Sequence, residues 1–325
     1  MQALARDLGL SSCEILFDAI YAQPKEDEVE EEHPSSPNDV PLSRVGSLFL
    51  VTCFIFSSVM FGANIALPPL SVFPGHARLV EQFIGTNGPA NIGTEEASVI
   101  DSILAIGFWL EKSDKFVSGP LEDEDFLQYL QSLSLISANS PSPTLRYGAH
   151  ILLSNILHAH PVDRTRLTFI IDTLENCPYE TLKASAVGWL KEELITAQER
   201  KSENLFSSTV ALASAQPYLF PDMSALAQAT DLEAWEEFRQ TFPFHMAVLN
   251  FLYFMGGKGY AHVVPPAMRT VSEEIYLGPL RVAQGRVKAS LEPGGEVHKG
   301  LGEVDAGVAL TEVELLGQRL EMFME

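Results

Sequence analysis

Two stretches of the chain, "TLRYGAHILLSNIL" (Thr144–Leu157) and "TLKASAVGWLKEEL" (Thr181–Leu194), repeat one pattern at an offset of 37 residues. When they are aligned, the threonine, the first leucine, a basic residue, a small residue, an alanine and two later leucines fall in register. An offset of this size lies near the length of known helical repeats. The echo therefore predicts a helical array, against the alternative that two unrelated amphipathic helices share a common pattern.

The residues between the two stretches complete the expected unit. Pro143 follows Ser142 at the start of the first helix, and "HAHP" predicts a turn. Asp163 is the expected cap of a second helix, and Cys177-Pro178 ends it. The third helix then repeats the apolar face of the first, which puts Trp189 in the core.

The rest of the chain from His76 onward continues as helices separated by short breaks. Thr94 is the expected cap of a helix with Glu95 and Glu96 in its first turn. "DLEAWEEFRQTF" and "PFHMAVLNFLYFMGG" predict two helices that meet near Pro243, and "EPGGEVHKGLGEVDAG" predicts a flexible segment. No alternating strand pair occurs. The fold class predicted for residues 76–325 is all-α, a HEAT/armadillo-like helical repeat solenoid.

The N-terminal part divides into three segments. Residues 1–23 predict one helix, and residues 24–44 predict a disordered linker because they are acidic and proline-rich. Residues 45–75 carry no charged side chain. Three interpretations of that apolar segment stay open: a buried helix, a membrane span, and a non-coding stretch translated by a faulty gene model. Because its densest part is short and its upstream flank is acidic, we expect a buried helix and no membrane insertion.

Composition limits the function. The chain has 43 acidic residues against 21 Lys and Arg, a formal net charge of −22, and 46% hydrophobic residues. That charge disfavours nucleic acid and anionic lipid and favours basic protein partners. Cys13, Cys53 and Cys177 form no disulfide framework and no metal or redox motif. The start of the chain has no secretory signal pattern, so we expect a cytoplasmic location, or a cytoplasmic and nuclear one.

No set of residues predicts catalysis. "GGKG" (Gly256–Gly259) lacks the spacing of a phosphate-binding loop and predicts a helix end. His158 and His160 do not share a helix face and predict solvated turn residues, and His245 predicts a satisfied core histidine. Acidic neighbours of Cys177 raise the pKa expected for its thiol. We therefore predict no enzyme, with no catalytic, metal-binding or cofactor-binding residues.

The region that contains the two repeated stretches resembles a known protein family. The segment "LTFIIDTLENCPYETLKASAVGWLKEEL" (Leu167–Leu194), with "GFWLEKSDKF" and "LRYGAHILLSNIL" upstream, resembles the glomulin-like family that includes the fungal YAP-binding proteins. The resemblance is good over Asp101–Arg200, extends to the C-terminus, and is poor before His76. It supplies no site residues to carry over.

That resemblance implies a non-enzymatic, all-helical scaffold. It implies an adaptor for an AP-1-type bZIP transcription factor in the fungal response to oxidative stress. Two alternatives come from other branches of the family: a glomulin-like inhibitor that binds the RING subunit of a cullin ubiquitin ligase, and a kinetochore-associated scaffold. An acidic protein suits a basic bZIP region or a RING surface equally well.

Overall fold

The computed structural model describes residues 13–21, 43–62, 70–86, 88–119, 121–257 and 259–323. Across these ranges the secondary structure is helical, and the only β-type pairing is an isolated bridge between Phe73 and Val117. The chain forms two compact units, Met1–Ala159 (unit 1) and His160–Glu325 (unit 2). The all-α fold class is confirmed. The predicted disordered linker falls almost entirely on residues outside the described ranges.

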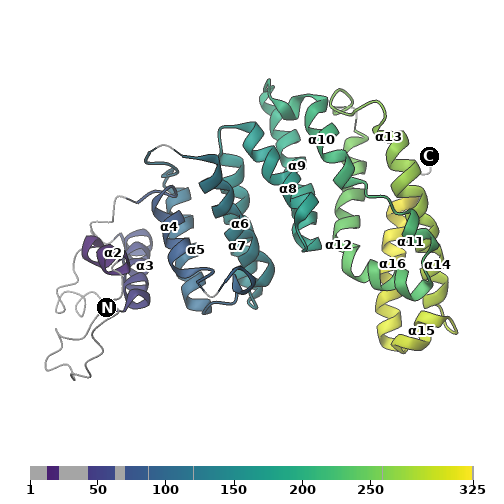
Figure 1. Cartoon of the computed structure of the whole chain (residues 1–325), viewed down its shortest axis with the longest axis horizontal. Helices are drawn as coiled ribbons and strands as arrows, with labels where there is room; N and C mark the ends of the chain where they lie inside the picture. Colours follow the sequence, from purple (N-terminus) through teal and green to yellow (C-terminus); the bar gives the residue numbers. More distant parts are fainter. Residues whose placement is uncertain are drawn as a thin grey trace. The chain divides into compact units, whose positions relative to one another are not determined.

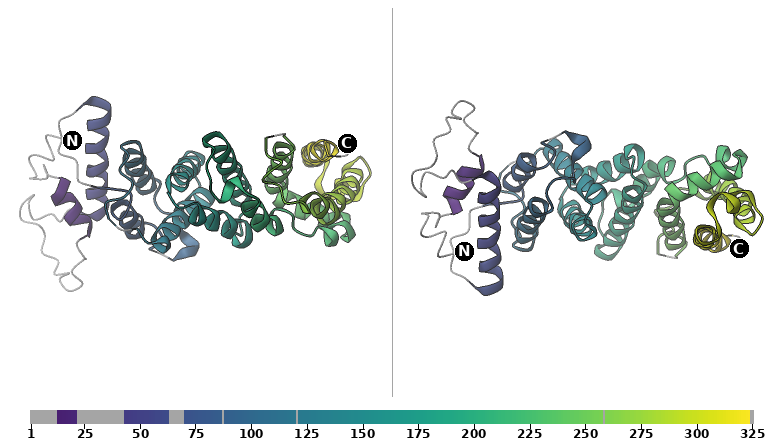
Figure 2. Two further views of the ribbon diagram at one scale, coloured as in Figure 1. Left: turned by 90° about the horizontal axis from the view of Figure 1, so that it is seen from above. Right: turned by 90° about the horizontal axis from the view of Figure 1, so that it is seen from below.

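Unit 1 is built from helices that pack on their neighbours (Figure 1). The contacts join α2 to α3, α3 to α5, α5 to α7 and α6 to α7. Figure 2 shows several of these helices nearly end-on while α3 is seen along its length, so α3 crosses their direction. The elements are α2 (Cys13–Tyr21), α3 (Arg44–Phe61), α4 (Gly75–Phe83), η2 (Pro89–Asn91), α5 (Ala97–Lys112), α6 (Asp123–Asn139) and α7 (Pro143–Ala159).

Helix α3 comes from the apolar segment and is buried on one side only. Ser43 caps it by accepting a hydrogen bond from the Gly46 amide, at 3.0 Å. Val51 and Phe54 are buried, whereas Phe61 is 77% exposed. By length and composition alone α3 could cross a membrane, and 28% of it is buried inside the protein. Residues 45–61 of the segment are helical, as expected, but the C-terminal end of this helix is exposed and is not core.

His76 joins three helices of unit 1. Its Nδ1 lies 2.9 Å from the Tyr129 hydroxyl and its Nε2 lies 2.8 Å from the Ile103 carbonyl oxygen. Gly107 makes room for the ring, since a Cβ there would lie 2.6 Å from Leu152 Cδ2 and 3.0 Å from His76 Cε1. Burial lowers the pKa of His76 to about 4, so the ring is neutral at pH 7.

Unit 2 begins with a helical hairpin, α8 (Asp163–Asn176) and α9 (Glu180–Arg200), which pack on each other. The long helix α12 then packs on α9 and on the C-terminal helices α14 and α16 (Figure 1). The other elements of unit 2 are η3 (Leu205–Ser207), α10 (Thr209–Leu219), α11 (Ser224–Gln228), α12 (Asp231–Met255), α13 (Met268–Val271), the π-helix η4 (Ser272–Leu277), α14 (Gly278–Leu291), α15 (Glu296–Leu301) and α16 (Glu303–Glu321).

The sequence echo corresponds to equivalent buried faces. In α7 of unit 1, Leu145 and Leu153 are buried, and in α9 of unit 2 their counterparts Leu182 and Leu190 are buried as well. Trp189 is 2% exposed and lies 5.7 Å, ring centre to ring centre, from Phe169. The prediction that Trp189 is core is confirmed. The two stretches are the same kind of helix in two successive parts of the chain.

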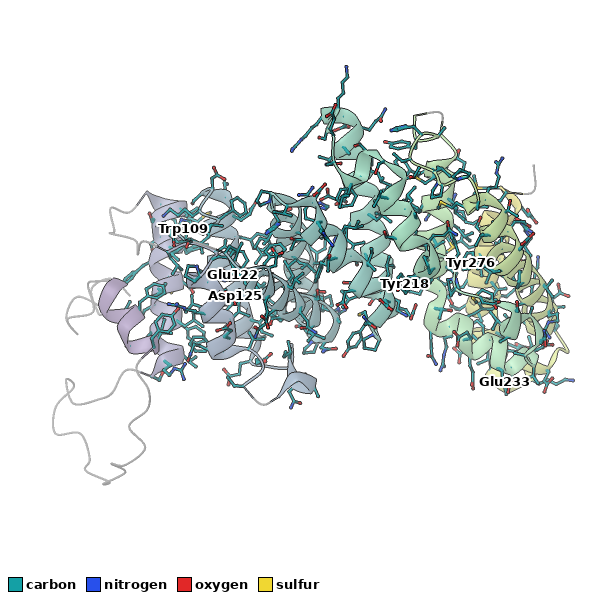
Figure 3. The ribbon with its side chains drawn as sticks, turned by 45° about the horizontal axis from the view of Figure 1, so that its top comes forward. Trp109, Glu122, Asp125, Tyr218, Glu233 and Tyr276 are labelled. Carbon is teal, nitrogen blue, oxygen red and sulfur yellow. The ribbon has the colours of Figure 1, made fainter. Side chains whose placement is uncertain are left out.

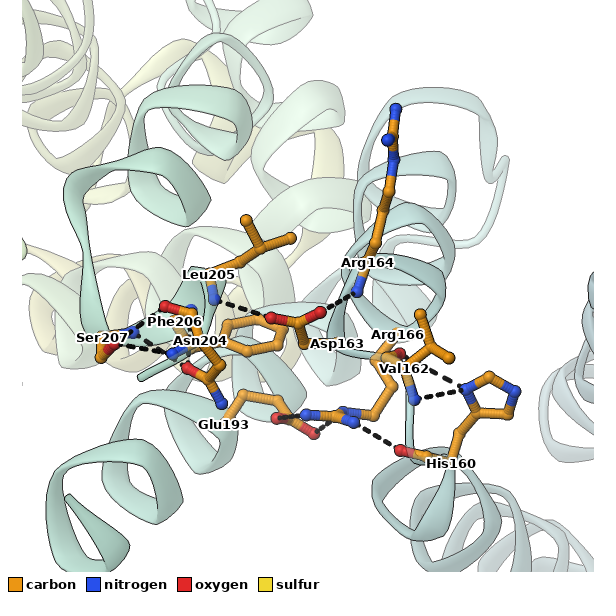
Figure 4. Close-up of polar contacts among 10 residues, drawn as sticks. All are labelled: His160, Val162, Asp163, Arg164, Arg166, Glu193, Asn204, Leu205, Phe206 and Ser207. Atoms are coloured by element: carbon orange, nitrogen blue, oxygen red, sulfur yellow. Dashed lines mark hydrogen bonds and ion pairs between the residues drawn. The ribbon is translucent and has the colours of Figure 1, made fainter. Parts of the chain in front are cut away.

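A buried polar cluster fixes the start of unit 2 (Figure 4). The Arg166 guanidinium donates to both carboxylate oxygens of Glu193, at 2.9 and 3.0 Å, and also to the His160 carbonyl oxygen. The same guanidinium lies over the Phe206 ring. Asp163 accepts from the Leu205 amide at 2.8 Å. These contacts tie α8, α9 and η3 together.

Two predicted helix caps are wrong, one by two residues and the other by one. Glu96, and not Thr94, is the N-cap of α5, because the Glu95 carboxylate accepts from the amides of Gly85 and Gly93, both at 2.7 Å. Asp163 is the first residue of α8 and not its cap. In both places a carboxylate near the helix start accepts from a backbone amide outside that helix, although Asp163 also accepts from the amide of Arg164 in α8, at 2.8 Å.

Two further expectations, both about where helices are interrupted, are wrong. The two helices predicted to meet near Pro243 are one continuous helix, α12, which keeps the proline inside it. The segment predicted to be flexible before the last helix contains α15 and the first residues of α16. Here packing of apolar residues such as Val297, which is 1% exposed, outweighs the local preference of the glycines.

Candidate protein-binding cleft

Unit 2 contains a cleft of about 560 Å³ between the ends of five helices. The ends of α8 and α10, the start of α9, the short helix α11 and the first half of α12 border it. Pro178 sets the turn from α8 to α9. A capping box fixes the start of α12, in which Thr230 and Glu233 bind each other's backbone amides. The helix ends bordering the cleft are therefore set by local sequence.

The rim of the cleft is acidic. The carboxylates that line it outnumber basic groups by five to one, and they are Glu175, Glu180, Asp222, Glu233 and Glu237, with Lys183 as the single basic residue. Lys183 lies 2.9 Å from Glu180, so part of its charge is already matched. Such a surface attracts cations and cationic peptides and repels phosphate.

Local hydrogen bonds hold several of these carboxylates in place. Asp222 accepts from Ser224 and Glu233 accepts from Thr230, and these bonds lower the pKa of both carboxyl groups. Both groups are therefore ionised at pH 7. A hydrogen bond to Glu175 raises the pKa of the Tyr218 phenol. Figure 3 labels Tyr218 and Glu233, which come from α10 and α12 respectively.

Most of the other residues in the lining are apolar. They include Leu174, Pro217, Pro221, Met223, Leu226 and Phe244. Clefts that bind ligands commonly combine an apolar lining with a few placed polar groups. This cleft has that composition, with carboxylates as the polar groups.

One carbonyl joins the cleft to the C-terminal helices. Pro279 has no amide hydrogen, so it cannot bond the carbonyl of Ile275 four residues earlier. The Ile275 oxygen instead accepts from the amide of Met223 on the cleft rim, at 2.9 Å. The chain accommodates this proline through the π-helix η4, where the Gly278 amide bonds to the Glu273 oxygen.

His245 lies in the lining and is only partly satisfied. Its Nδ1 is 2.8 Å from the Tyr276 hydroxyl, whereas Nε2 has no hydrogen-bond partner among the described residues. Burial lowers the pKa of His245 to about 4 and raises that of Tyr276. The prediction of a satisfied core histidine is thus half right: the residue is core, but one nitrogen is unbonded.

The other residues considered from the sequence do not assemble into a site. His160 is 7% exposed, so the prediction that it is solvated is wrong; its Nδ1 accepts from the Val162 amide at 3.3 Å, just before α8. Gly256 ends α12, as predicted, and Lys258 lies outside the described residues. The pKa of Cys177 is raised, as predicted, but burial is the main cause and the acidic neighbours add less. In the described part of the chain no three His, Cys, Asp or Glu residues are grouped as metal ligands.

The acidic run at the start of α6 is exposed to solvent. Glu122 and Asp125, labelled in Figure 3, are both exposed in unit 1. The sequence did not predict the cleft. Its carboxylates come from four separate segments, and only the acidic excess of the whole chain indicated that such a surface would exist.

The chain matches a known protein family over nearly its whole length. A family model described as "Uncharacterised protein family, YAP/Alf4/glomulin" matches residues 2–318. A search of the curated proteins finds no match. The family match includes the apolar segment and the residues before it, so the expectation that the resemblance is poor before His76 is wrong.

Proposed function

The chain belongs to the YAP/Alf4/glomulin family, and from that membership we propose that it is a non-enzymatic adaptor for a bZIP transcription factor of the AP-1 type in the fungal oxidative-stress response. Membership of this family supports a protein-binding function in general. The specific partner, the fungal setting and a cytoplasmic or cytoplasmic and nuclear location are part of the proposal.

The acidic cleft is the observation that carries this proposal. The DNA-binding region of a bZIP factor is a continuous basic segment, and five carboxylates border a partly apolar cleft in unit 2. The net charge of −22 speeds encounter with such a partner through long-range attraction. Binding should therefore weaken as the salt concentration rises. Added salt shortens the Debye length, which is about 8 Å at physiological salt, and so reduces the range over which opposite charges attract.

Two other family functions predict different partners. A glomulin-like inhibitor would bind the RING subunit of a cullin ubiquitin ligase, and a kinetochore scaffold would bind kinetochore proteins. Both are protein-binding functions that an all-helical chain can perform. The charge of the chain does not favour the bZIP partner over a basic RING surface.

Affinity purification of the tagged full-length chain from peroxide-treated cells tests the proposal, with untreated cells as the control. We expect a bZIP factor to be enriched after peroxide at low salt and reduced at high salt. A strain that lacks the protein should be sensitive to peroxide because the bZIP factor is not oxidised. Recovery of a RING subunit with normal peroxide tolerance, or of kinetochore proteins, would replace the proposal with that alternative. Recovery of no protein partner would contradict the adaptor function itself.

A further inference from the structure

His76 and His245 are both buried and both pair with a tyrosine, but they differ in how many of their ring nitrogens have a hydrogen-bond partner. In unit 1, both ring nitrogens of His76 have partners, the Tyr129 hydroxyl and the Ile103 carbonyl oxygen. In unit 2, His245 has only the Tyr276 hydroxyl. Its Nε2 is covered and has no partner in the part of the chain that the structure describes. A buried polar group left without a partner destabilises a fold, because it has lost its hydrogen bonds to water and gained none in return.

Which group donates the hydrogen bond between His245 and Tyr276 follows from the partners that each group does not have. The Tyr276 side chain is fully buried, and His245 Nδ1 is the only hydrogen-bond partner found for its hydroxyl among the described residues. An unpaired buried O–H is costly, so the hydroxyl donates to Nδ1. The neutral ring then carries its proton on Nε2, which becomes a buried donor without an acceptor in a residue that lines the cleft.

An occupant of the cleft therefore has to offer two things. It must carry positive charge for the carboxylates of the rim, and it must carry an oxygen acceptor for the Nε2–H of His245. A metal ion offers no acceptor, and a phosphate is repelled by the rim. A peptide rich in lysine or arginine offers both, because every residue has a carbonyl oxygen.

We propose that this cleft binds a lysine- or arginine-rich segment of a partner protein. Its cationic side chains lie against Glu237 and Glu175, and one of its backbone carbonyl oxygens accepts from His245 Nε2. Because Nε2 is covered in the free chain, the segment displaces a side chain of the lining when it binds. The inference rests on the proposed adaptor function and names the surface and the partner chemistry that serve it.

Neighbouring glutamates on α12 supply a matched pair of variants. Glu237 lines the cleft, and Glu236 is also exposed but lies outside the lining. Glu237→Lys and Glu236→Lys change the net charge of the chain equally and alter the same helix. Any difference between them therefore reports the cleft and not the general attraction of an acidic protein for a cation.

The probe is a fluorescein-labelled peptide of alternating arginine and alanine, titrated with the full-length chain at about 0.15 M salt. We expect Glu237→Lys to weaken binding about tenfold and Glu236→Lys less than about twofold. NMR of the histidine side chains should show the Nε2–H resonance of His245 shifting when the peptide saturates the chain. Equal loss of affinity in the two variants, or an unchanged His245 resonance, would overturn the inference.

The same variants separate this inference from the proposed function. If the Glu237→Lys chain still recovers the cellular partner as well as the natural chain does, the adaptor function stands and the cleft inference fails. If the peptide binds as expected but cells yield no protein partner, the cleft inference stands and the adaptor function fails.

Discussion

Arg166 and Glu193 form a two-point ion pair between α8 and α9, with hydrogen bonds of 2.9 and 3.0 Å and side chains only 10% and 4% exposed. Removing one partner would leave the other charge buried and unmatched. We expect Glu193→Ala to lower the free energy of unfolding of unit 2 by about 3–5 kcal/mol. Urea denaturation followed by tryptophan fluorescence measures the change.

The control is the pair of Lys183 and Glu180, which lies nearer the surface at 2.9 Å. Glu180→Ala should lower the free energy of unfolding by less than about 1 kcal/mol. An equally small effect of Glu193→Ala would show that Arg166 finds water or another partner when the carboxylate is gone.

Trp189 is expected to stabilise unit 2 through packing. It is 2% exposed and stacks obliquely on Phe169. Trp189→Ala should lower the free energy of unfolding by about 3–5 kcal/mol, since a cavity remains where the indole was. Tyr147→Ala is the control because that ring is 68% exposed, and it should change stability by no more than about 0.5 kcal/mol. Thermal denaturation followed by circular dichroism compares the two variants. An unchanged melting temperature for Trp189→Ala would contradict the assignment of Trp189 to the core.

Stability should fall as the pH drops from about 6.5 to about 4. Burial lowers the pKa of His76 and of His245 from 6.5 to about 4, so in this range the unfolded chain binds protons that the folded chain does not. Each histidine should reduce the free energy of unfolding by about 1.4 kcal/mol per pH unit within that range and by nothing further above pH 6.5. Urea denaturation at a series of pH values measures the slope.

His76→Gln should reduce that slope for unit 1, where Trp109 reports unfolding, because one of the titrating groups is removed. His262→Gln is the control, since His262 is exposed. If the slope is the same in the natural chain and in His76→Gln, another group causes the acid sensitivity.

Helix α3 should not anchor the chain in a membrane, although its length and composition would allow it to cross one. Part of the helix, including Leu48 and Ile55, is already buried against the protein. We expect the full-length chain in the soluble fraction after carbonate extraction of cell membranes. A chain that stays in the pellet, and is released when residues 45–73 are deleted, would reverse this expectation. Transcript sequencing that removes these codons would instead support the faulty gene model.

The sequence predicted well where one helix face is enough to decide the structure. Leu145 and Leu182 were expected on equivalent buried faces, and both are buried because periodic apolar residues can reach the core only in that orientation. Prediction failed where a polar side chain acts at a distance along the chain. Glu95 binds Gly85 and Asp163 binds Leu205, and no local pattern records either contact.

The cleft could not be predicted for the same reason. Glu175 and Glu237 lie far apart in the sequence and meet only because α8 and α12 fold beside the same cavity. The signal that could be found was the excess of carboxylates over the whole chain. His245 was identified as core from its apolar neighbours, but whether both of its nitrogens have partners depends on Tyr276 in a distant helix.

The π-helix at Ser272–Leu277 has a consequence for the end of the chain. A π-turn holds one residue more than an α-turn, and each residue of a helix advances its faces by about 100°. That extra residue therefore sets the rotational phase of α14, whose inward side carries Leu280, Ala283 and Val287. Deleting a single residue here would turn those side chains toward water and bring polar neighbours such as Arg281 inward. One inserted residue thus sets which face of α14 is buried, and it lies in the same π-helix as Tyr276, whose hydroxyl pairs with His245 in the cleft lining.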